Sequence, residues 1–147
     1  LLFEQGEIVK FMTRAALLLT ALLAIFLTAC SGPKNTPDGV AVAFIERSYK
    51  GDVNGAMSLV HLPDSSKPGK TEMAQGKMKA MIAKAREKAE SQGGMEEITV
   101  QSSEIDADDP NRARVALKVR FKQGEGMEKV RLIQVEGKWK IFASAGF

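Results

Sequence analysis

Residues with obvious chemical potential are few in this 147-residue chain, which has one cysteine, Cys30, and one histidine, His61. A histidine can act as a general base when a partner orients it. Here we interpret His61 as a solvent-facing or helix-ending residue beside Pro63, because it lies where a short helix stops and a loop begins. A His-based metal cluster is excluded because the chain has no second histidine. The sequence therefore predicts no catalytic set, no metal site and no cofactor.

Three carboxylates stand close together at Asp106, Asp108 and Asp109, in the segment DADDPN. A calcium loop needs oxygen ligands at regular spacing, a glycine turn and a distant glutamate. The segment lacks that pattern, and Asp and Asn are favoured in turns. We expect a solvated hairpin turn over residues 106–111.

An apolar run over residues 15–27 follows Lys10 and Arg14 and leads to Cys30. A basic start, a short apolar core and small residues at the exit are the parts of a secretory signal peptide. A plain membrane-anchor helix is the alternative, but about 20 apolar residues are needed to cross a bilayer. We therefore expect residues 1–29 to be a signal peptide, with translation starting at Met12.

The end of this segment, Leu27-Thr28-Ala29-Cys30, resembles the lipobox of bacterial lipoproteins. The resemblance implies a diacylglycerol on the Cys30 sulfur, cleavage before Cys30 and acylation of the new amino end, so that membrane lipid is the first partner. It also implies, from Ser31 in the next position, sorting to the outer membrane. Residues 30–35 would then be the lipidated cysteine and a tether. Such an anchor also explains a lone cysteine in an exported chain.

Composition points to one folded domain over residues 36–147. The chain is 44% hydrophobic and 27% charged, which is typical of globular proteins. The formal net charge of +3 is mild, and with an exported location it argues against a nucleic-acid partner.

Hydrophobic periodicity predicts three helices followed by strands. The first helix begins at Thr36-Pro37-Asp38 and ends at Gly51, with one buried side. A short helix follows Asp52, and a long one runs from Thr71 to about Ser91. The buried side of the first helix should comprise Val40, Ala41, Phe44, Ile45, Ser48 and Tyr49, and that of the long helix Ala74, Met78, Met81, Ile82, Ala85 and Ala89.

After Met95 the apolar period changes to alternation, most clearly over residues 112–122. About four strands joined by hairpins are expected, beginning near Ile98 and ending with residues 138–142. Helices segregated from strands indicate an α+β fold, with N-terminal helices packed on a curved antiparallel sheet.

Two stretches are similar to the nuclear-transport-factor-2-like superfamily. They are Pro37 to Phe44 followed by Tyr49-Lys50-Gly51-Asp52 and Ala56-Met57, and the last hairpin, residues 130–141. The hairpin resembles that of small bacterial lipoproteins with a domain of unknown function. The resemblance implies a cone, a bent sheet wrapped on helices with a cavity at its open end. Enzymes of this superfamily place an acid or a histidine in that cavity, and we match none of those residues here.

Two sets of residues are candidates for binding. Phe44, Met81, Phe121 and Trp139 would line or fill the cavity of the cone. Arg112, Arg114, Lys118, Arg120 and Lys122 form one polar side of a strand and could meet an anionic envelope polymer, lipid headgroups or an acidic envelope protein. An ordinary solvated sheet face, its charges answered by Glu97, Glu104 or Glu128, is the interpretation we favour.

The sequence thus predicts an outer-membrane lipoprotein facing the periplasm, whose domain is a non-enzymatic binding or structural module. The alternative is a small-ligand carrier or isomerase-like enzyme that uses the cavity of the cone.

Overall fold

The computed structural model describes residues 32–62 and 69–143. Contacts divide the chain into one unit ending at Gly32 and another beginning at Pro33, and all elements below belong to the second. The predicted signal peptide, Met12 and Cys30 lie outside the described residues. No helix in the described ranges is long and apolar enough to cross a bilayer.

Helix α2 (Pro37–Lys50) forms as predicted, with Pro37 in its first turn and Gly51 as a left-handed cap at φ 76°. The Thr36 hydroxyl accepts a hydrogen bond from the Gly39 N–H at 3.2 Å, which satisfies one free donor of the first turn. The six residues predicted for its inner side are its buried residues. Helix α3 (Val53–Met57) follows, capped by Asp52.

Helix α4 (Lys70–Ser91) follows Gly69 and begins one residue before the predicted start at Thr71. Met78, Ile82 and Ala89 are its buried residues, whereas Met81 remains 40% exposed. Helix α2 packs on the sheet, and α4 packs chiefly on α2 and α3 rather than directly on the sheet. The N-terminal helices therefore cover one face of the curved sheet, as the sequence predicted, and α2 makes most of the contact.

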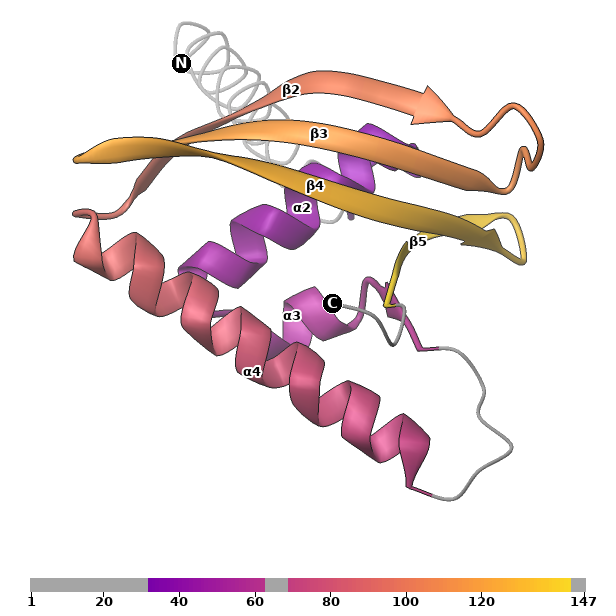
Figure 1. Cartoon of the computed structure of the whole chain (residues 1–147), viewed down its shortest axis with the longest axis horizontal. Coiled ribbons are helices and arrows are strands. Elements are labelled where there is room, and N and C mark those ends of the chain that lie inside the picture. The colour runs from indigo at the N-terminus through magenta and orange to yellow at the C-terminus, as the bar shows by residue number, and fades with distance from the viewer. Residues whose placement is uncertain (1–31, 63–68, 144–147) are drawn as a thin grey trace, which may run out of the picture. The chain divides into compact units, whose positions relative to one another are not determined.

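The sheet has five strands in the order β1-β5-β4-β3-β2. They are β1 (Val60–His61), β2 (Met95–Ile105), β3 (Arg112–Phe121), β4 (Gly124–Val135) and β5 (Lys138–Phe142). β2 to β5 form an antiparallel meander, and β1 pairs in parallel with β5. The sequence missed β1, because two residues carry no alternation. The bowed strands lie over α2 in Figure 1.

The core lies between α2 and the inner face of the sheet. Along β3 the buried residues are Ala113, Val115, Leu117, Val119 and Phe121, and the intervening side chains point to the opposite, outer face. Leu117 and Val119 are completely buried. This alternation fixes the register, because a one-residue slip would put every apolar side chain in water.

Asn35 is more ordered than a tether residue should be. Its side-chain amide donates to the Gly137 carbonyl at 2.8 Å and its oxygen accepts from the Trp139 N–H at 2.9 Å. These bonds fix Asn35 to the β4–β5 turn. Asn35, just before the predicted start of the domain at residue 36, therefore contacts the sheet directly.

Candidate functional site

A cleft of about 250 Å³ lies between α2, α4 and β4. Its walls are largely apolar and its remaining lining groups are polar. The apolar lining consists of Phe44, Ile45, Met81, Ile82 and Ala85, and the polar lining of Ser48, Tyr49, Lys84, Lys88 and Glu128.

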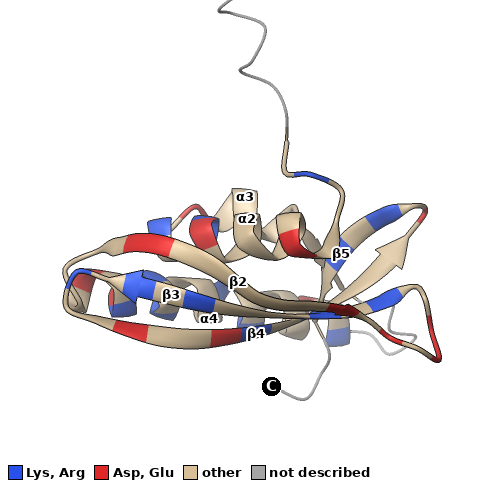
Figure 2. Ribbon diagram, turned by 90° about the horizontal axis from the view of Figure 1, so that it is seen from above, with Lys and Arg blue, Asp and Glu red and all other residues tan. Residues whose placement is uncertain are grey.

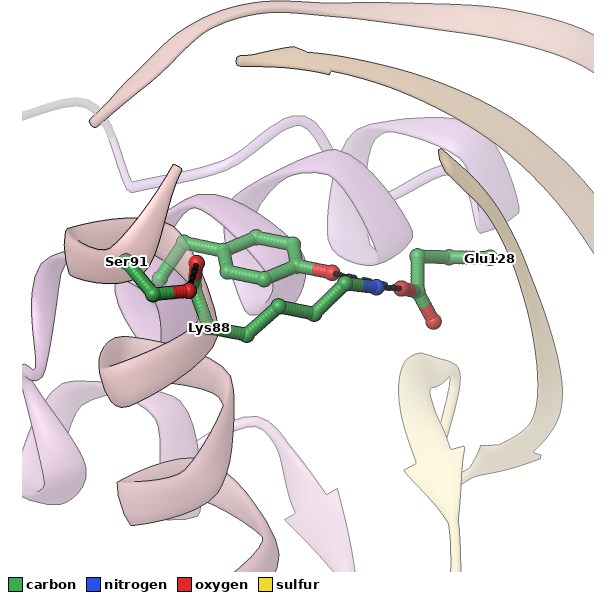
Figure 3. Close-up of polar contacts among 4 residues, drawn as sticks. Lys88, Ser91 and Glu128 are labelled. Atoms are coloured by element: carbon green, nitrogen blue, oxygen red, sulfur yellow. Dashed lines mark hydrogen bonds and ion pairs between the residues drawn. The ribbon is translucent and has the colours of Figure 1, made fainter. Parts of the chain in front are cut away.

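Three of the polar groups meet in the cleft, one from each element. The Tyr49 hydroxyl donates to Glu128 Oε1 at 2.5 Å, and Lys88 Nζ approaches the same oxygen at 3.2 Å. Lys88 Nζ also lies 3.4 Å from the Tyr49 oxygen. Figure 3 shows the Lys88 side chain extended toward Glu128. Two donors on one carboxylate oxygen make this a preorganised polar centre, and the hydrogen bonds that the described residues make to Glu128 are both to Oε1.

The alternation of β4 explains why a carboxylate faces the helices. Val130 and Leu132 are buried on the inner face, so Glu128 shares their side of the strand. In register it stands opposite fully buried Leu117. Its side chain is only 30% exposed. A charge drawn this far from water needs partners, which Tyr49 and Lys88 supply.

Tyr49 is buried, and its ring packs edge-on against Phe121 with centroids 5.1 Å apart. Burial raises the pKa of its phenol well above 10, and the hydrogen bond to Glu128 and the charge of that carboxylate raise it further. The phenol therefore keeps its proton at neutral pH and acts as a donor. Lys88 Nζ sits 5.8 Å from the Tyr49 ring centroid and 5.7 Å from that of Phe121, so both rings add a cation–π attraction.

The other hydroxyl in the cleft lining, that of Ser48, is hydrogen-bonded to the backbone. Ser48 is buried and donates to the Phe44 carbonyl at 2.7 Å, one turn earlier in α2. Over residues 32–62 and 69–143, no three His, Cys, Asp or Glu side chains stand close enough to hold a metal ion.

The four residues predicted to line one cavity do not lie together. Phe44 and Met81 line the cleft, and Phe121 packs beside it. Trp139 instead lines a separate hollow, with Pro33, Val40 and Leu59 among its neighbours. The register explains the separation: Phe121 pairs with Gly124 and Trp139 with Gln134, at opposite ends of β4. Ten residues of strand span roughly 33 Å.

The basic residues predicted as an anionic-partner face lie mostly on the outer face, and four of the five have acidic neighbours. Figure 2 shows basic segments of β3 between acidic segments of β2 and β4. The pairs are Arg112 with Asp109 at 3.1 Å, Arg114 with Asp106 at 3.8 Å, Lys118 with Glu125 at 2.8 Å and Arg120 with Glu97 at 2.9 Å. Lys122 is exposed in the turn after β3.

Of the acids expected to answer this face, Glu97 does so and Glu104 is in register with Arg114. Glu128 does not, because it points to the helices. A hollow of about 430 Å³ lies on this face over Ala116, between Arg114, Lys129 and Glu104. Its lining carries three cations, Arg114, Lys129 and Arg131, and one carboxylate, Glu104.

The acidic segment over residues 106–111 forms part of a turn, and His61 forms part of a strand. Asp106 Oδ1 accepts from the Asp108 N–H and Asp109 Oδ1 from the Asn111 N–H, both at 3.0 Å, which makes residues 106–111 the predicted turn. His61, expected in a loop, belongs to β1 and pairs with Phe142. His61 is absent from the lining of the cleft.

Sequence reasoning missed the polar centre of the cleft. Tyr49 was assigned to the buried side of the first helix, and Lys88 was not among the candidate binding residues. The available signal was the alternation of side chains along β4. Glu128 lies two residues before Val130 and four before Leu132, and both of these residues face inward. A carboxylate in phase with a buried row indicates a functional or ion-paired site.

The fold is similar to that of solved structures, and the sequence matches a family model. A protein from Campylobacter jejuni, provisionally named an NTF2-like transpeptidase, has a similar structure, with a TM-score of 0.66 and 22% identity over 74% of this chain and 98% of that one. An NTF2-like protein of unknown function from Shewanella oneidensis MR-1 is more distant, with a TM-score of 0.42 and 13% identity over 69% and 88% of the two chains.

At this level of identity the likeness shows the fold alone, which is NTF2-like as the sequence predicted. No curated protein matches the chain by sequence. The family model described as Domain of unknown function (DUF4878) matches residues 28–142. The chain therefore belongs to the DUF4878 family.

Proposed function

We propose that this protein is a bacterial lipoprotein, anchored by acylated Cys30 in the outer membrane and facing the periplasm, whose domain is a non-enzymatic binding module. The anchoring rests on the signal-peptide pattern and the lipobox-like sequence before Cys30. Two or more acyl chains are needed for stable attachment, and the lipobox modification supplies them.

The binding site in this proposal is the cleft between α2, α4 and β4. The observation that carries it is an apolar cleft that contains a polar centre built from three separate elements, Tyr49, Lys88 and Glu128. Ligand sites typically combine mostly apolar walls with a few placed polar groups. The volume of about 250 Å³ lies just below the usual range for drug-sized ligands, so the ligand is small or enters only in part.

An enzyme of isomerase-like type is the second candidate, and one observation favours it. Glu128 lines the cleft, and both of its hydrogen bonds from described residues go to Oε1, which leaves Oε2 to accept a substrate proton. We prefer the binding role because Tyr49 and Lys88 both address Oε1 and hold the carboxylate in one orientation. Turnover of a carbonyl substrate that Glu128→Gln abolishes would reverse this preference.

Filling the cleft tests the proposed site. Decanol, titrated into the protein and followed by heteronuclear NMR, should shift signals of Tyr49, Met81 and Ala85. Ala85→Phe should remove these shifts, and Met81→Trp should do the same if the first variant folds poorly. Ala80→Phe is the matched control, because Ala80 is exposed on the same helix and outside the cleft lining. Unchanged binding in both filling variants would refute the cleft as the site.

Anchoring has its own test. Cys30→Ala should leave a precursor that is neither lipidated nor retained with the outer membrane after fractionation. Retention of a processed Cys30→Ala protein in that fraction would contradict the proposed anchor.

A further inference from the structure

Helix α4 carries a row of lysines that leads into the cleft. Lys70, Lys77 and Lys84 are seven residues apart, and Lys88 follows one turn later. Seven residues are nearly two helical turns, so the three lie along one flank of α4, roughly 10 Å from one to the next. Lys84 and Lys88 line the cleft itself.

This row is short of acidic partners. Lys88 is engaged with Glu128. Lys70, Lys77 and Lys84 are exposed, and no carboxylate pairs with them among the described residues. On the opposite flank of α4, Arg86 pairs with Glu90 at 2.8 Å, whereas Lys79 has no acidic partner among the described residues. Of the lysines without such a partner, Lys84 is the one that lines the cleft.

A small ligand held in this place would meet an apolar wall and a cationic edge together. Met81 and Ala85 offer the apolar wall. Lys84 lies about one helical turn after Met81 and directly before Ala85 in the sequence. Lysine binds phosphate and carboxylate as a flexible point charge, without the fixed geometry of arginine. Lys77 lies two turns farther along the flank, where a larger or doubly charged head group would reach it.

We infer that the ligand of the cleft is a single-chain amphiphile with an anionic head group, its apolar chain in the cleft and its phosphate or carboxylate on Lys84 and Lys77. This inference rests on the proposed function of the cleft. It adds the sign of the charge on the head group and the residues that bind it.

Alkyl probes of one chain length separate the contributions. Decyl phosphate, decanol, decyltrimethylammonium and inorganic phosphate are titrated below their micelle concentrations into the full chain. Decyl phosphate should bind most tightly and decyltrimethylammonium most weakly among the alkyl probes. Raising the salt concentration should weaken the binding of decyl phosphate and leave the binding of decanol unchanged, because salt screens exposed charges.

Charge reversal then locates the head group. Lys84→Glu should weaken the binding of decyl phosphate about three- to fivefold and leave that of decanol within about twofold, since each exposed charge contact contributes less than about 1 kcal/mol. Lys77→Glu should have a smaller effect in the same direction. Lys79→Glu is the matched control: it makes the same charge change on the same helix, outside the lysine row and the cleft lining, and should change neither affinity.

The outcomes distinguish the two levels of the proposal. Equal affinity for decyl phosphate and decyltrimethylammonium, or equal effects of Lys84→Glu and Lys79→Glu, overturns the anionic head group and leaves the cleft standing. Inorganic phosphate binding as tightly as decyl phosphate overturns the placement of the chain in the cleft. Failure of every alkyl probe to bind overturns both this inference and the proposed function.

Discussion

The two faces of the sheet hold their charged residues in different ways. On the inner face, β4 presents Glu128, whose partners come from α2 and α4, 79 and 40 residues away in the chain. On the outer face, charges lie in pairs between neighbouring or nearby positions, such as Lys118 with Glu125 across the β3–β4 hairpin. The inner contacts exist only in the complete fold, whereas the outer ones need little more than a hairpin.

This difference indicates which charges matter for function. Exposed ion pairs contribute about 0–1 kcal/mol, and they chiefly keep a face soluble and fix its register. A half-buried carboxylate with two donors has a larger cost of desolvation and a defined orientation. This contrast supports the proposal that the inner centre serves recognition, and the following variants can break or sharpen it.

The largest difference between the faces should appear at neighbouring positions of β3. Leu117→Ala opens a cavity beneath Glu128 at a fully buried site and should lower the free energy of unfolding by about 2–5 kcal/mol. Lys118→Ala, one residue later on the outer face, should change it by less than about 1 kcal/mol. Urea unfolding measures both, and similar losses would contradict the assignment of the two faces.

Tyr49→Phe keeps the ring against Phe121 and removes only the hydroxyl that donates to Glu128. We expect a loss of about 1–3 kcal/mol in the free energy of unfolding, the usual range for a hydrogen bond to a charged group. Glu97→Gln, which weakens an exposed pair with Arg120, is the control and should cost under about 1 kcal/mol. An unchanged free energy of unfolding in Tyr49→Phe would show that the hydrogen bond from Tyr49 to Glu128 does not order the cleft.

The raised pKa of Tyr49 also makes stability depend on pH. Below pH about 10 both states carry the phenolic proton, and above it the unfolded chain ionises first, so stability is lost as the pH rises toward the folded pKa. Tyr49 is the only tyrosine, so phenolate absorbance reports it alone. Its titration should lie above pH 10 in the native protein and return to about 10 in urea. Tyr49→Phe should flatten the decline in stability on the alkaline side.

Much of the fold was predictable because its signals are local. Thr36, Pro37 and Gly51 bracket α2 through capping preferences, and the alternation of β3 gives both its extent and its buried side. The sequence could not place α4 on α2 instead of on the sheet. An apolar stripe indicates that one side of a helix is buried, but it does not indicate which element buries it.

The candidate site was less accessible to sequence reasoning. Met81 and Phe44 were predicted for the cavity and line it, but Trp139 was placed there only because it is large and apolar. Tyr49, Lys88 and Glu128 meet across long sequence separations, and helical or alternating patterns do not encode such meetings. Only the phase of Glu128 within β4 carried a local hint.

The smallest expected effect concerns coupling within pairs. A double-mutant cycle on Lys118 and Glu125, with Lys118→Met and Glu125→Gln, should give an interaction energy of about 0–0.5 kcal/mol, because both side chains are about half exposed and water screens them. The same cycle on Lys88 and Glu128 should give roughly 1 kcal/mol or more, since Glu128 is less exposed and shares its oxygen with Tyr49. Chemical unfolding supplies the four free energies of each cycle. High salt should reduce the first coupling toward zero and reduce the second only in part. Equal couplings that respond equally to salt would mean that the inner centre is one more surface ion pair, and the contrast between the faces would then rest on packing alone.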